Sequence, residues 1–578
     1  MFFSQKSLLV VCFLISCQSL QALTDNFDTL YNSKNNPTIV TLFEWNFDDV
    51  AEECEKFLGP YGYSAVQVSP VFEHRKIVGM SGEPDRAWYE RYQLVSFKLI
   101  SRSGTEEQFV KMVNRCNEAG VRVLVDLSLN HMSSSVENGV GVGGSKFSGH
   151  KKHYPEVPFE KSDFHGHSHC PTRSLQIENY NDLVQVRNCE HLGRHDLNHE
   201  RSSVKDVIVN AVQKLLSAGV AGFKLDSARH IRPDHLKEIF QRTDLNHLYP
   251  EGSKPLLVHD VRPCCNYDRN QVSASGEYVH IGRANEYYYH REILEVFKKK
   301  SAKKLGNLNS VLKNREIVST SSDDAIVFVD NAEFQREMRF DGINFLSPKE
   351  LKTATAFMLA WPYGTPNIMS SYDWRAVSNP NGRGQHSGPP MDAKGFTSPI
   401  VRNSDLTCGS PWLCEHRWRQ IYNMVKFRNF VGNEPVQNWI THNDDAISFS
   451  RGNKGFIAMN IGNGNLNAKT VPTGLPAGNY CDIITGNIES DGTCSGTVYE
   501  VAEDTTTTIN IDGKSSNPMV ALYVGARLRG EDDDKPMEPE TPESDMKCQR
   551  NQEEDQIILD HCSICMKSLY NLPAHNEL

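Results

Sequence analysis

Polar and charged residues close several short apolar segments of this chain. Asp226 ends the segment GFKLD, Asp260 lies near the end of PLLVHDV, and Asn331 ends AIVFVDN. Carboxyl groups that lie together can act as nucleophile, acid or base, and carboxylates with amides can bind a hard cation such as calcium. These residues are therefore the first candidates for chemistry.

The segments that carry these candidates alternate with amphipathic stretches. Apolar and β-branched residues fill the ranges 38–45, 64–71, 121–130, 222–226, 255–261 and 325–331. Between them, residues 106–119 and 203–218 place apolar side chains at helical spacing. This alternation predicts an α/β fold, a (β/α)8 barrel of the TIM type, in which the C-terminal ends of the strands carry the site.

The pattern changes from about residue 438, where short strands are separated by Gly and Asn turns. We expect a C-terminal antiparallel β domain over 438–526. Residues 527–578 begin with an acidic, Pro-rich linker and continue into a Cys-containing tail that ends in HNEL. The barrel is expected over 23–437.

The first 22 residues predict a signal peptide. Lys6 precedes the apolar run Leu8–Ile15, and Ala22 is a suitable cleavage residue. No other stretch reaches the roughly 20 apolar residues of a membrane helix, so we expect no membrane span. The formal net charge of -11 argues against nucleic acid as a partner. The mature chain is expected in the secretory pathway, either secreted or retained in the endoplasmic reticulum (ER) lumen.

Cysteine positions fit an oxidising compartment. Eight of the 15 cysteines lie where pairs are expected: Cys54 with Cys116, Cys170 with Cys189, Cys408 with Cys414, and Cys481 with Cys494. Two more belong to the leader. Five remain, an odd number, so at least one thiol is free or bonded to another chain; these are Cys264, Cys265, Cys548, Cys562 and Cys565.

Two features of the tail leave alternatives open. HNEL resembles the KDEL and HDEL retrieval signals. This predicts an ER retrieval receptor as partner or, if no receptor recognises HNEL, plain secretion. The CSIC stretch at Cys562–Cys565 could form a local disulfide, an intermolecular bond through Cys548 to a thiol partner, or part of a metal site.

Long phrases identify a known family. The chain resembles the animal α-amylases of glycoside hydrolase family thirteen over about residues 24–526, in phrases such as LFEWNFDDVAEECEKFLGPYGYSAVQVSP, WYERYQLVSFKL, IENYNDLVQVRNC, GVAGFKLDSARH and CEHRWRQIYNMVKFRN. The resemblance implies a TIM-type barrel with an excursion after strand three, at about 131–200, and a C-terminal β domain. It also implies α-1,4-glucans such as starch, glycogen or maltooligosaccharides as substrates.

The resemblance assigns roles to three carboxylates. Asp226 matches the nucleophile of a retaining mechanism, Asp260 stands where the family has a Glu as the acid, and Glu333 stands where the family has an Asp that hydrogen-bonds the sugar. Ala332 replaces a His beside that third carboxylate. A carboxyl group withdrawn by about 1 Å can lose on the order of 100-fold in rate, so reduced hydrolysis is expected.

The resemblance also implies two ion sites. Calcium is expected on Asn130, the carbonyl of Arg187, Asp196 and the carbonyl of His230. The family's chloride site is held by two Arg and an Asn. Here Lys224 and Asn331 match the first Arg and the Asn, and the phrase MSSYDW matches the second Arg to Asp373, so chloride is doubtful.

The positions that contact sugar in the family match this chain better than the catalytic and chloride positions do. The resemblance implies sugar contacts at Trp88, Tyr89, Tyr92, Gln93, His131 and Arg229. Two functions remain open. The first is a retaining α-1,4-glucan hydrolase of reduced activity. The second is a non-catalytic protein of the ER lumen that binds glucan or a protein partner.

Overall fold

The computed structural model describes residues 37–78, 85–249, 253–263, 274–314, 316–336, 342–377 and 384–529. The predicted signal peptide, Cys264, Cys265 and the HNEL tail with its three cysteines lie outside these residues. All elements below belong to one compact unit, residues 1–528. Among the described residues, no helix combines the length and apolarity that crossing a membrane requires.

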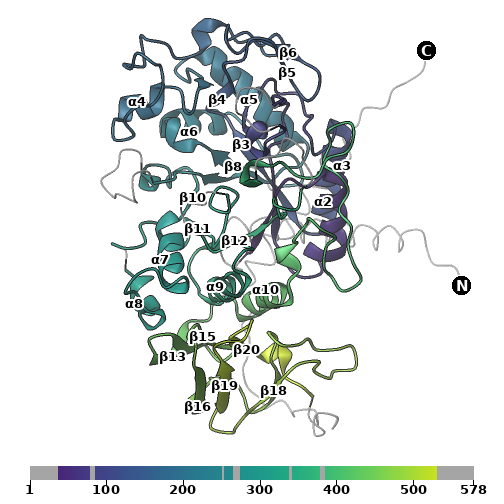
Figure 1. Cartoon of the computed structure of the whole chain (residues 1–578), viewed down its shortest axis with the longest axis vertical. Coiled ribbons are helices and arrows are strands. Elements are labelled where there is room, and N and C mark those ends of the chain that lie inside the picture. The colour runs from purple at the N-terminus through teal and green to yellow at the C-terminus, as the bar shows by residue number, and fades with distance from the viewer. Residues whose placement is uncertain are drawn as a thin grey trace, which may run out of the picture. The chain divides into compact units, whose positions relative to one another are not determined.

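Eight parallel strands close into a barrel, which confirms the predicted fold (Figure 1). The strands follow one another around the barrel in the order β1-β12-β11-β10-β9-β8-β3-β2. They are β1 (Ile39–Leu42), β2 (Ala65–Val68), β3 (Arg122–Ser128), β8 (Gly222–Asp226), β9 (Leu256–His259), β10 (Arg283–Asn285), β11 (Ala325–Val327) and β12 (Thr365–Ser370). Because all run in one direction, their C-terminal ends meet at one end of the barrel.

Helices pack on the outside of the barrel strands. They are α2 (Phe47–Glu53), α3 (Glu106–Glu118), α5 (Ser202–Ser217), α6 (Pro233–Gln241), α7 (Tyr287–Phe297), α8 (Leu308–Val311), α9 (Pro348–Ala360) and α10 (Arg419–Val431). Local sequence explains their bounds. Thr105 and Gln108 form a capping box at the start of α3, and Pro233 occupies the first turn of α6, where its missing N–H costs nothing.

Burial of whole strands holds the barrel together. Every residue of β3 is buried, in keeping with a strand that is covered on both faces. Arg122 and Asp126 are the charged exceptions in this run; Arg122 bonds Asn117, and Asp126 contributes to the site described below. A buried charge needs a partner, so an acid in an apolar strand indicates function or a local ion pair.

The excursion after β3 contains short elements: β4 (His131–Ser134), β5 (Gly139–Val140), β6 (Lys146–Phe147), α4 (Leu183–Asn188) and β7 (Arg194–Asp196). Strand β4 pairs antiparallel with β7, so His131 lies opposite Asp196. This pairing returns the far end of the excursion to the end of β3.

The C-terminal region is an antiparallel β domain, as expected (Figure 1). Its strands are β13 (Val436–Asn443), β14 (Ala446–Arg451), β15 (Gly455–Asn460), β16 (Asn465–Pro472), β17 (Gly478–Cys481), β18 (Val498–Val501), β19 (Thr506–Asp512) and β20 (Met519–Tyr523). Arg451 ties this domain to the barrel helices, because its Nη1 donates to the carbonyl oxygen of Ala360 in α9 at 2.6 Å.

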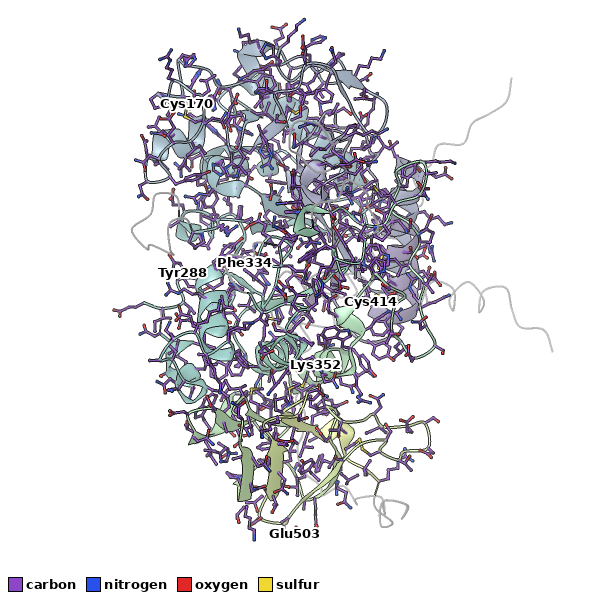
Figure 2. All side chains as sticks on the ribbon, viewed as in Figure 1. Cys170, Tyr288, Phe334, Lys352, Cys414 and Glu503 are labelled. Atoms are coloured by element: carbon purple, nitrogen blue, oxygen red, sulfur yellow. A yellow bond between two sulfur atoms is a disulfide. The ribbon has the colours of Figure 1, made fainter. Side chains whose placement is uncertain are left out.

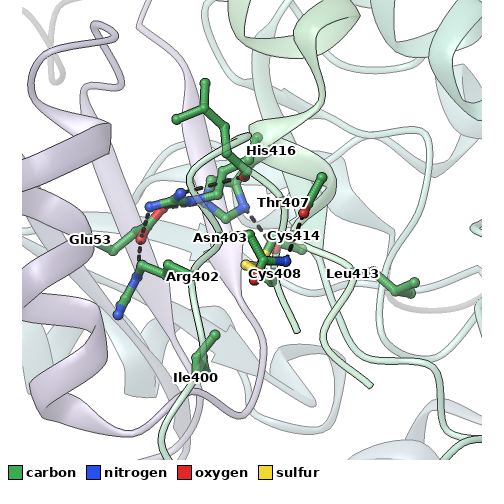
Figure 3. The surroundings of a disulfide bond; sticks show 12 residues. Glu53, Ile400, Arg402, Asn403, Thr407, Cys408, Leu413, Cys414 and His416 are labelled. Carbon is green, nitrogen blue, oxygen red and sulfur yellow. Dashed lines mark hydrogen bonds and ion pairs between the residues drawn. A yellow bond between two sulfur atoms is a disulfide. The ribbon is translucent and has the colours of Figure 1, made fainter. Parts of the chain in front are cut away.

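Within the described ranges the structure contains four disulfides, and they are the four predicted pairs. The Cys170–Cys189 bond closes a loop of the excursion (Figure 2). The Cys408–Cys414 bond lies beside Glu53, which accepts hydrogen bonds from His416 and Arg402 (Figure 3). This second bond therefore sits where α2 meets the last part of the barrel.

Candidate active site

Three carboxylates converge at the C-terminal end of the barrel. Asp226 is the last residue of β8, Asp260 follows β9 directly, and Glu333 lies on the segment after β11. One carboxylate oxygen of each lies within 4.8 Å of the others. The side chains that the sequence assigned to nucleophile, acid and third carboxylate are thus brought together, and they come from three different strands.

A lysine ammonium joins two of these carboxylates. Lys224 Nζ lies 2.8 Å from Asp260 Oδ2, 3.1 Å from Asp226 Oδ1 and 3.4 Å from Asp126 Oδ1. Burial opposes the charge on Lys224, but Asp126, Asp260 and Asp226 outweigh it and raise the pKa of Lys224 well above its ordinary value. The positive charge in this acidic cluster is therefore supplied by the chain, and a divalent metal there would meet a fixed ammonium.

Asp260 is held by neutral donors as well. The hydroxyl of Tyr287, at the start of α7, donates to Asp260 Oδ1, and Asn285 Nδ2 lies 3.3 Å from the same oxygen. Lys224 approaches the other oxygen. A general acid must carry a proton, and a proton on Asp260 would have to take the place of one of these donors.

Glu333 is held by an arginine from the neighbouring rim. Arg262 Nη1 lies 2.8 Å from Glu333 Oε2, and its guanidinium stacks over the Phe334 ring at 4.8 Å. Asn331 shapes the turn, because its side-chain oxygen accepts the backbone N–H groups of Glu333 at 3.1 Å and Phe334 at 2.8 Å. The third carboxylate is therefore in place but ion-paired.

A small polar cavity of about 60 Å³ lies among these groups inside the barrel. Asp126 from β3 lines it; Tyr92 donates to Asp126 Oδ2 at 2.7 Å, whereas Asp126 Oδ1 is buried without a hydrogen-bond partner among the described residues. Burial raises the pKa of Asp126 to about 7.

Residues expected to face sugar fall into two groups. Trp88 and Tyr92 line the cavity, with their rings edge to face at 6.0 Å. Gln93 and His131 are buried against protein partners: Gln93 Oε1 accepts from the Ser134 hydroxyl at 2.8 Å, and His131 Nε2 lies 2.9 Å from the Tyr92 carbonyl. This second pair holds the wall of the site in place.

The two remaining sugar-facing candidates lie nearer the rim. Tyr89 packs edge to face against His386 at 6.1 Å. Arg229 donates to the carbonyl oxygen of Arg262 at 2.8 Å and lies over the Tyr180 ring at 5.8 Å. Arg229 thus fixes the backbone from which Arg262 reaches Glu333.

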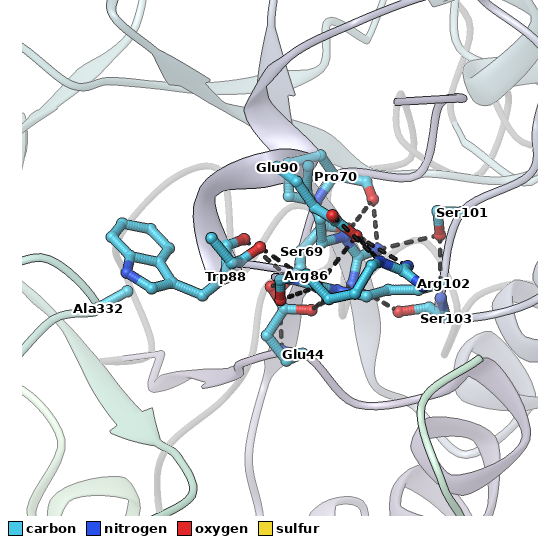
Figure 4. A network of polar contacts seen from close by, with 12 residues as sticks. Glu44, Ser69, Pro70, Arg86, Trp88, Glu90, Ser101, Arg102, Ser103 and Ala332 are labelled. Carbon is cyan, nitrogen blue, oxygen red and sulfur yellow. Dashed lines mark hydrogen bonds and ion pairs between the residues drawn. The ribbon is translucent and has the colours of Figure 1, made fainter. Parts of the chain in front are cut away.

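A buried ion network positions Trp88 (Figure 4). Arg102 Nη2 donates to the Trp88 carbonyl oxygen and to Glu44, each at 2.8 Å, and Arg91 pairs with Glu44 at 2.9 Å. Burial disfavours the charge on Glu44, yet the two arginines lower the pKa of that carboxyl. The indole extends from this network toward Ala332.

The four candidate calcium ligands lie around the junction of β3 with the excursion. Asn130 Nδ2 lies 2.9 Å from Asp196 Oδ1, and Asn130 Oδ1 is buried without a partner among the described residues. His230 Nδ1 donates to the Val186 carbonyl at 2.7 Å, next to Arg187 in the chain. An unpaired amide oxygen beside a carboxylate is the donor type that calcium prefers, so these residues fit that ion.

The structure corrects one assignment in the expected chloride site. Asp373 does not line the cavity; it pairs with Arg375 at 2.7 Å near the surface. The residues of β12 that do line the cavity are Asn367 and Met369, together with Lys224 of β8 and Asn331, which follows β11. Asp373 lies three residues beyond the end of β12 at Ser370.

Four functional candidates escaped the sequence analysis: Asp126, Arg262, Asn285 and Tyr287. Asp126 had a usable signal, because it is an acid inside an otherwise apolar strand. Arg262 had a weaker one, as it follows Asp260 by two residues. For Asn285 and Tyr287 we find no signal in the local pattern.

Comparison with known proteins agrees with this geometry. The family description "Alpha amylase, catalytic domain" matches residues 55–365, and "Alpha amylase, C-terminal all-beta domain" matches residues 439–523. An α-amylase of Dermatophagoides pteronyssinus is 42% identical over 505 residues, which cover 86% of this chain and 98% of the relative. Pancreatic α-amylase 2a5 of Mus musculus is 38% identical, covering 86% and 96%.

Solved structures agree as well. The crystal structure of α-amylase I from Eisenia fetida superposes with a TM-score of 0.77 at 36% identity, covering 86% of this chain and 98% of that one. A variant of the same earthworm enzyme, solved with maltohexaose, gives 0.76. With matching catalytic and all-β domains, a closed barrel and three carboxylates at its C-terminal end, the chain belongs to the α-amylase family.

Proposed function

We propose that this chain is a retaining hydrolase of α-1,4-glucans, with Asp226 as nucleophile and Asp260 as acid and base. The observation that carries the proposal is the separation of the carboxylates, within 4.8 Å of one another. Retaining enzymes hold the two groups about 5–5.5 Å apart, whereas inverting enzymes leave about 6.5–9.5 Å for a water. A solved relative that holds maltohexaose supports the substrate class.

The reaction then has two steps. Asp226 bonds to the anomeric carbon while the glycosidic bond breaks and the leaving oxygen takes a proton from Asp260. Water next attacks the same carbon, Asp260 takes the water proton, and the bond to Asp226 breaks. Glu333 accepts hydrogen bonds from the sugar hydroxyls once its ion pair with Arg262 is broken.

We propose that turnover is slow. Asp260 is one methylene shorter than the family's Glu and is held by Lys224 and Tyr287. Ala332 offers no hydrogen-bond donor where the family has a His. Because general-acid catalysis is typically worth ~10²–10⁴-fold, a poorly placed acid reduces the rate strongly without abolishing glucan binding.

A second candidate is a protein that binds glucan without hydrolysing it. The observation that favours it is that Asp260 and Glu333 are both engaged by cations of the chain, Lys224 and Arg262. Such a protein would keep the aromatic wall formed by Trp88 and Tyr92 and lose turnover.

One experiment separates the two. Purified full-length protein with calcium is incubated with maltoheptaose, and products are measured by mass spectrometry against Asp226→Asn. Hydrolysis by the wild type that Asp226→Asn abolishes supports the enzyme. Binding by calorimetry without any product above the Asp226→Asn level supports the binding protein, and neither binding nor product contradicts both.

We propose that calcium is bound by Asn130, Asp196 and the carbonyl oxygens of Arg187 and His230. The support is the unpaired, buried oxygen of Asn130 beside the Asp196 carboxylate. The ion would supply structural cross-linking, tying the excursion to the end of β3. The two carbonyl ligands come from the end of α4 and from the short helix Ala228–His230.

We further propose that the chain enters the secretory pathway and is retained in the ER lumen through HNEL. The four disulfides fit an oxidising compartment. Expression in cultured animal cells tests this: wild type should remain intracellular, and deletion of the last four residues should release it to the medium. Equal secretion of both would contradict retention. Non-reducing electrophoresis of a Cys548→Ser, Cys562→Ser and Cys565→Ser variant tests for a thiol partner of the tail.

A further inference from the structure

The cavity beneath the carboxylates has the charge of a cation site, although the family places chloride there. Among the described residues that line it, Lys224 is the single cationic side chain. The carboxylates that line it are Asp126, Asp260, Asp330 and Glu333. An anion in this cavity would face carboxyl oxygens at short range in a weakly screened interior.

The one cation is already surrounded by carboxylates. A lysine ammonium has three N–H bonds to donate, and three carboxylates surround this one at 2.8, 3.1 and 3.4 Å. Binding chloride would require Lys224 to leave one of them. An Arg at this position would keep further N–H donors for chloride after bonding the carboxylates, which a compact ammonium does not.

The amides of the cavity are also engaged. Asn367 accepts from the Thr41 hydroxyl at 2.9 Å and donates to the Gln67 side-chain oxygen at 3.0 Å. Asn331 uses its oxygen to accept the backbone N–H groups of its own turn. Asn367 is therefore bonded through both its oxygen and its nitrogen, and Asn331 through its oxygen.

Two of the unsatisfied atoms around the cavity are carboxylate oxygens, and a third is the indole nitrogen of Trp88, a donor. Asp126 Oδ1 and Asp330 Oδ1 are buried and have no hydrogen-bond partner among the described residues. Both side chains are about 95% buried, since each is 5% exposed. Carboxylate oxygens of this kind accept hydrogen bonds from water and repel an anion.

We propose that this cavity excludes chloride and that Lys224 is the internal counter-ion that positions Asp226 against Asp260. The carboxylates of the chain thereby balance the Lys224 ammonium, and turnover does not depend on chloride. The part that concerns turnover rests on the proposed hydrolase function, whereas the exclusion of chloride does not.

The primary test measures chloride binding without using activity. The full-length, calcium-loaded protein is prepared in acetate buffer and titrated with sodium chloride at constant ionic strength, and the ³⁵Cl NMR linewidth is recorded. Wild type should show no saturable broadening. Saturable broadening in the wild type that Lys224→Met removes would overturn the proposal.

Two variants provide a matched pair. Lys224→Arg with Asn367→Arg places two guanidinium groups in the cavity and should create saturable chloride broadening. Lys224→Arg with Asp373→Arg adds the same two guanidinium groups, with the second where the side chain does not reach the cavity, and it should not. If the second pair bound chloride as well as the first, the location of the site would be wrong. Circular dichroism confirms that each variant is folded, and the wild-type titration decides the proposal if one is not.

The second arm measures maltoheptaose hydrolysis over the same chloride titration. Wild-type kcat should change by less than about twofold, since no step of the barrier includes the ion. A several-fold rise in kcat with chloride would contradict the proposal. Lys224→Met should lower kcat more than it raises KM and alter the pH profile, with partial recovery in Lys224→Arg. Absence of turnover at every chloride concentration would instead count against the proposed hydrolase function.

Discussion

Arg262 and Glu333 are joined across the rim of the barrel, with Nη1 and Oε2 2.8 Å apart. The two residues come from the segments that follow β9 and β11, and β10 lies between these strands in the barrel. The pair is partly exposed, with 26% of the Arg262 side chain and 37% of the Glu333 side chain accessible. A pair this accessible is worth only about 0–1 kcal/mol, so a substrate can displace it.

Replacing Arg262 should therefore improve hydrolysis. In Arg262→Gln, Glu333 no longer has to leave a cation before it accepts sugar hydroxyls. We expect kcat/KM for maltoheptaose to rise by up to about fivefold, in line with the worth of a partly exposed pair. The control is Arg375→Gln, which removes a comparable ion pair with Asp373 away from the cavity. A fall in kcat/KM would mean that Arg262 orients Glu333 for use.

Lengthening the acid should raise kcat. Asp260→Glu restores the reach of the carboxyl group by about 1 Å, and such a displacement can be worth on the order of 100-fold. The gain is expected in kcat measured with maltoheptaose. Asp405→Glu, an exposed acid of the Cys408 loop, is the control. No gain from Asp260→Glu combined with Glu333→Asp would show that the loss extends beyond these two positions.

Stability should depend on pH through Asp126. Burial raises the folded-state pKa of Asp126 to about 7, well above the value of about 4 for an aspartate in an unfolded chain. Between these values the folded state binds more protons than the unfolded state, so stability falls as pH rises through about 4 to 7. We expect the Tm of the calcium-saturated wild type to fall by more degrees between about pH 4 and 7 than the Tm of Asp126→Asn. Parallel Tm curves, with Asp206→Asn as control, would contradict this assignment.

Removing calcium should destabilise the excursion. A ligand that binds the folded state alone adds stability, by about 2.7 kcal/mol at a concentration 100 times its Kd. EGTA should therefore lower the Tm of the wild type by several degrees, and readdition of calcium should restore it. Asp196→Asn should begin lower and respond little to EGTA. If EGTA does not change the Tm of the wild type, the proposed calcium binding is contradicted.

The sequence predicted much of this architecture for physical reasons. Apolar runs that alternate with amphipathic stretches favour a parallel barrel, and parallel strands bring their C-terminal ends together. Asp226 and Asp260 directly end or follow such strands, and the convergence of their side chains was therefore predictable. The four disulfides were predictable because each pair brackets or links recognisable segments.

Features set by loop conformation were not predictable in this way. Arg262 lies beyond its strand, where the direction of a side chain depends on the path of the loop. The Asp373 assignment failed for a related reason. Asn367 and Met369 line the cavity with the period of two that a strand imposes, whereas Asp373 follows the end of β12 and turns away. Counting strand register would have favoured Asn367.

The contacts of Glu53 can form only late in the synthesis of the chain. Glu53 is fully buried in α2 and accepts from His416, 363 residues later in the chain, and from Arg417. At about 5–20 residues per second, the ribosome needs roughly 20–70 s to add that length. For that interval Glu53 lacks both His416 and Arg417, so the early part of the barrel is a client for chaperones of whichever compartment it enters.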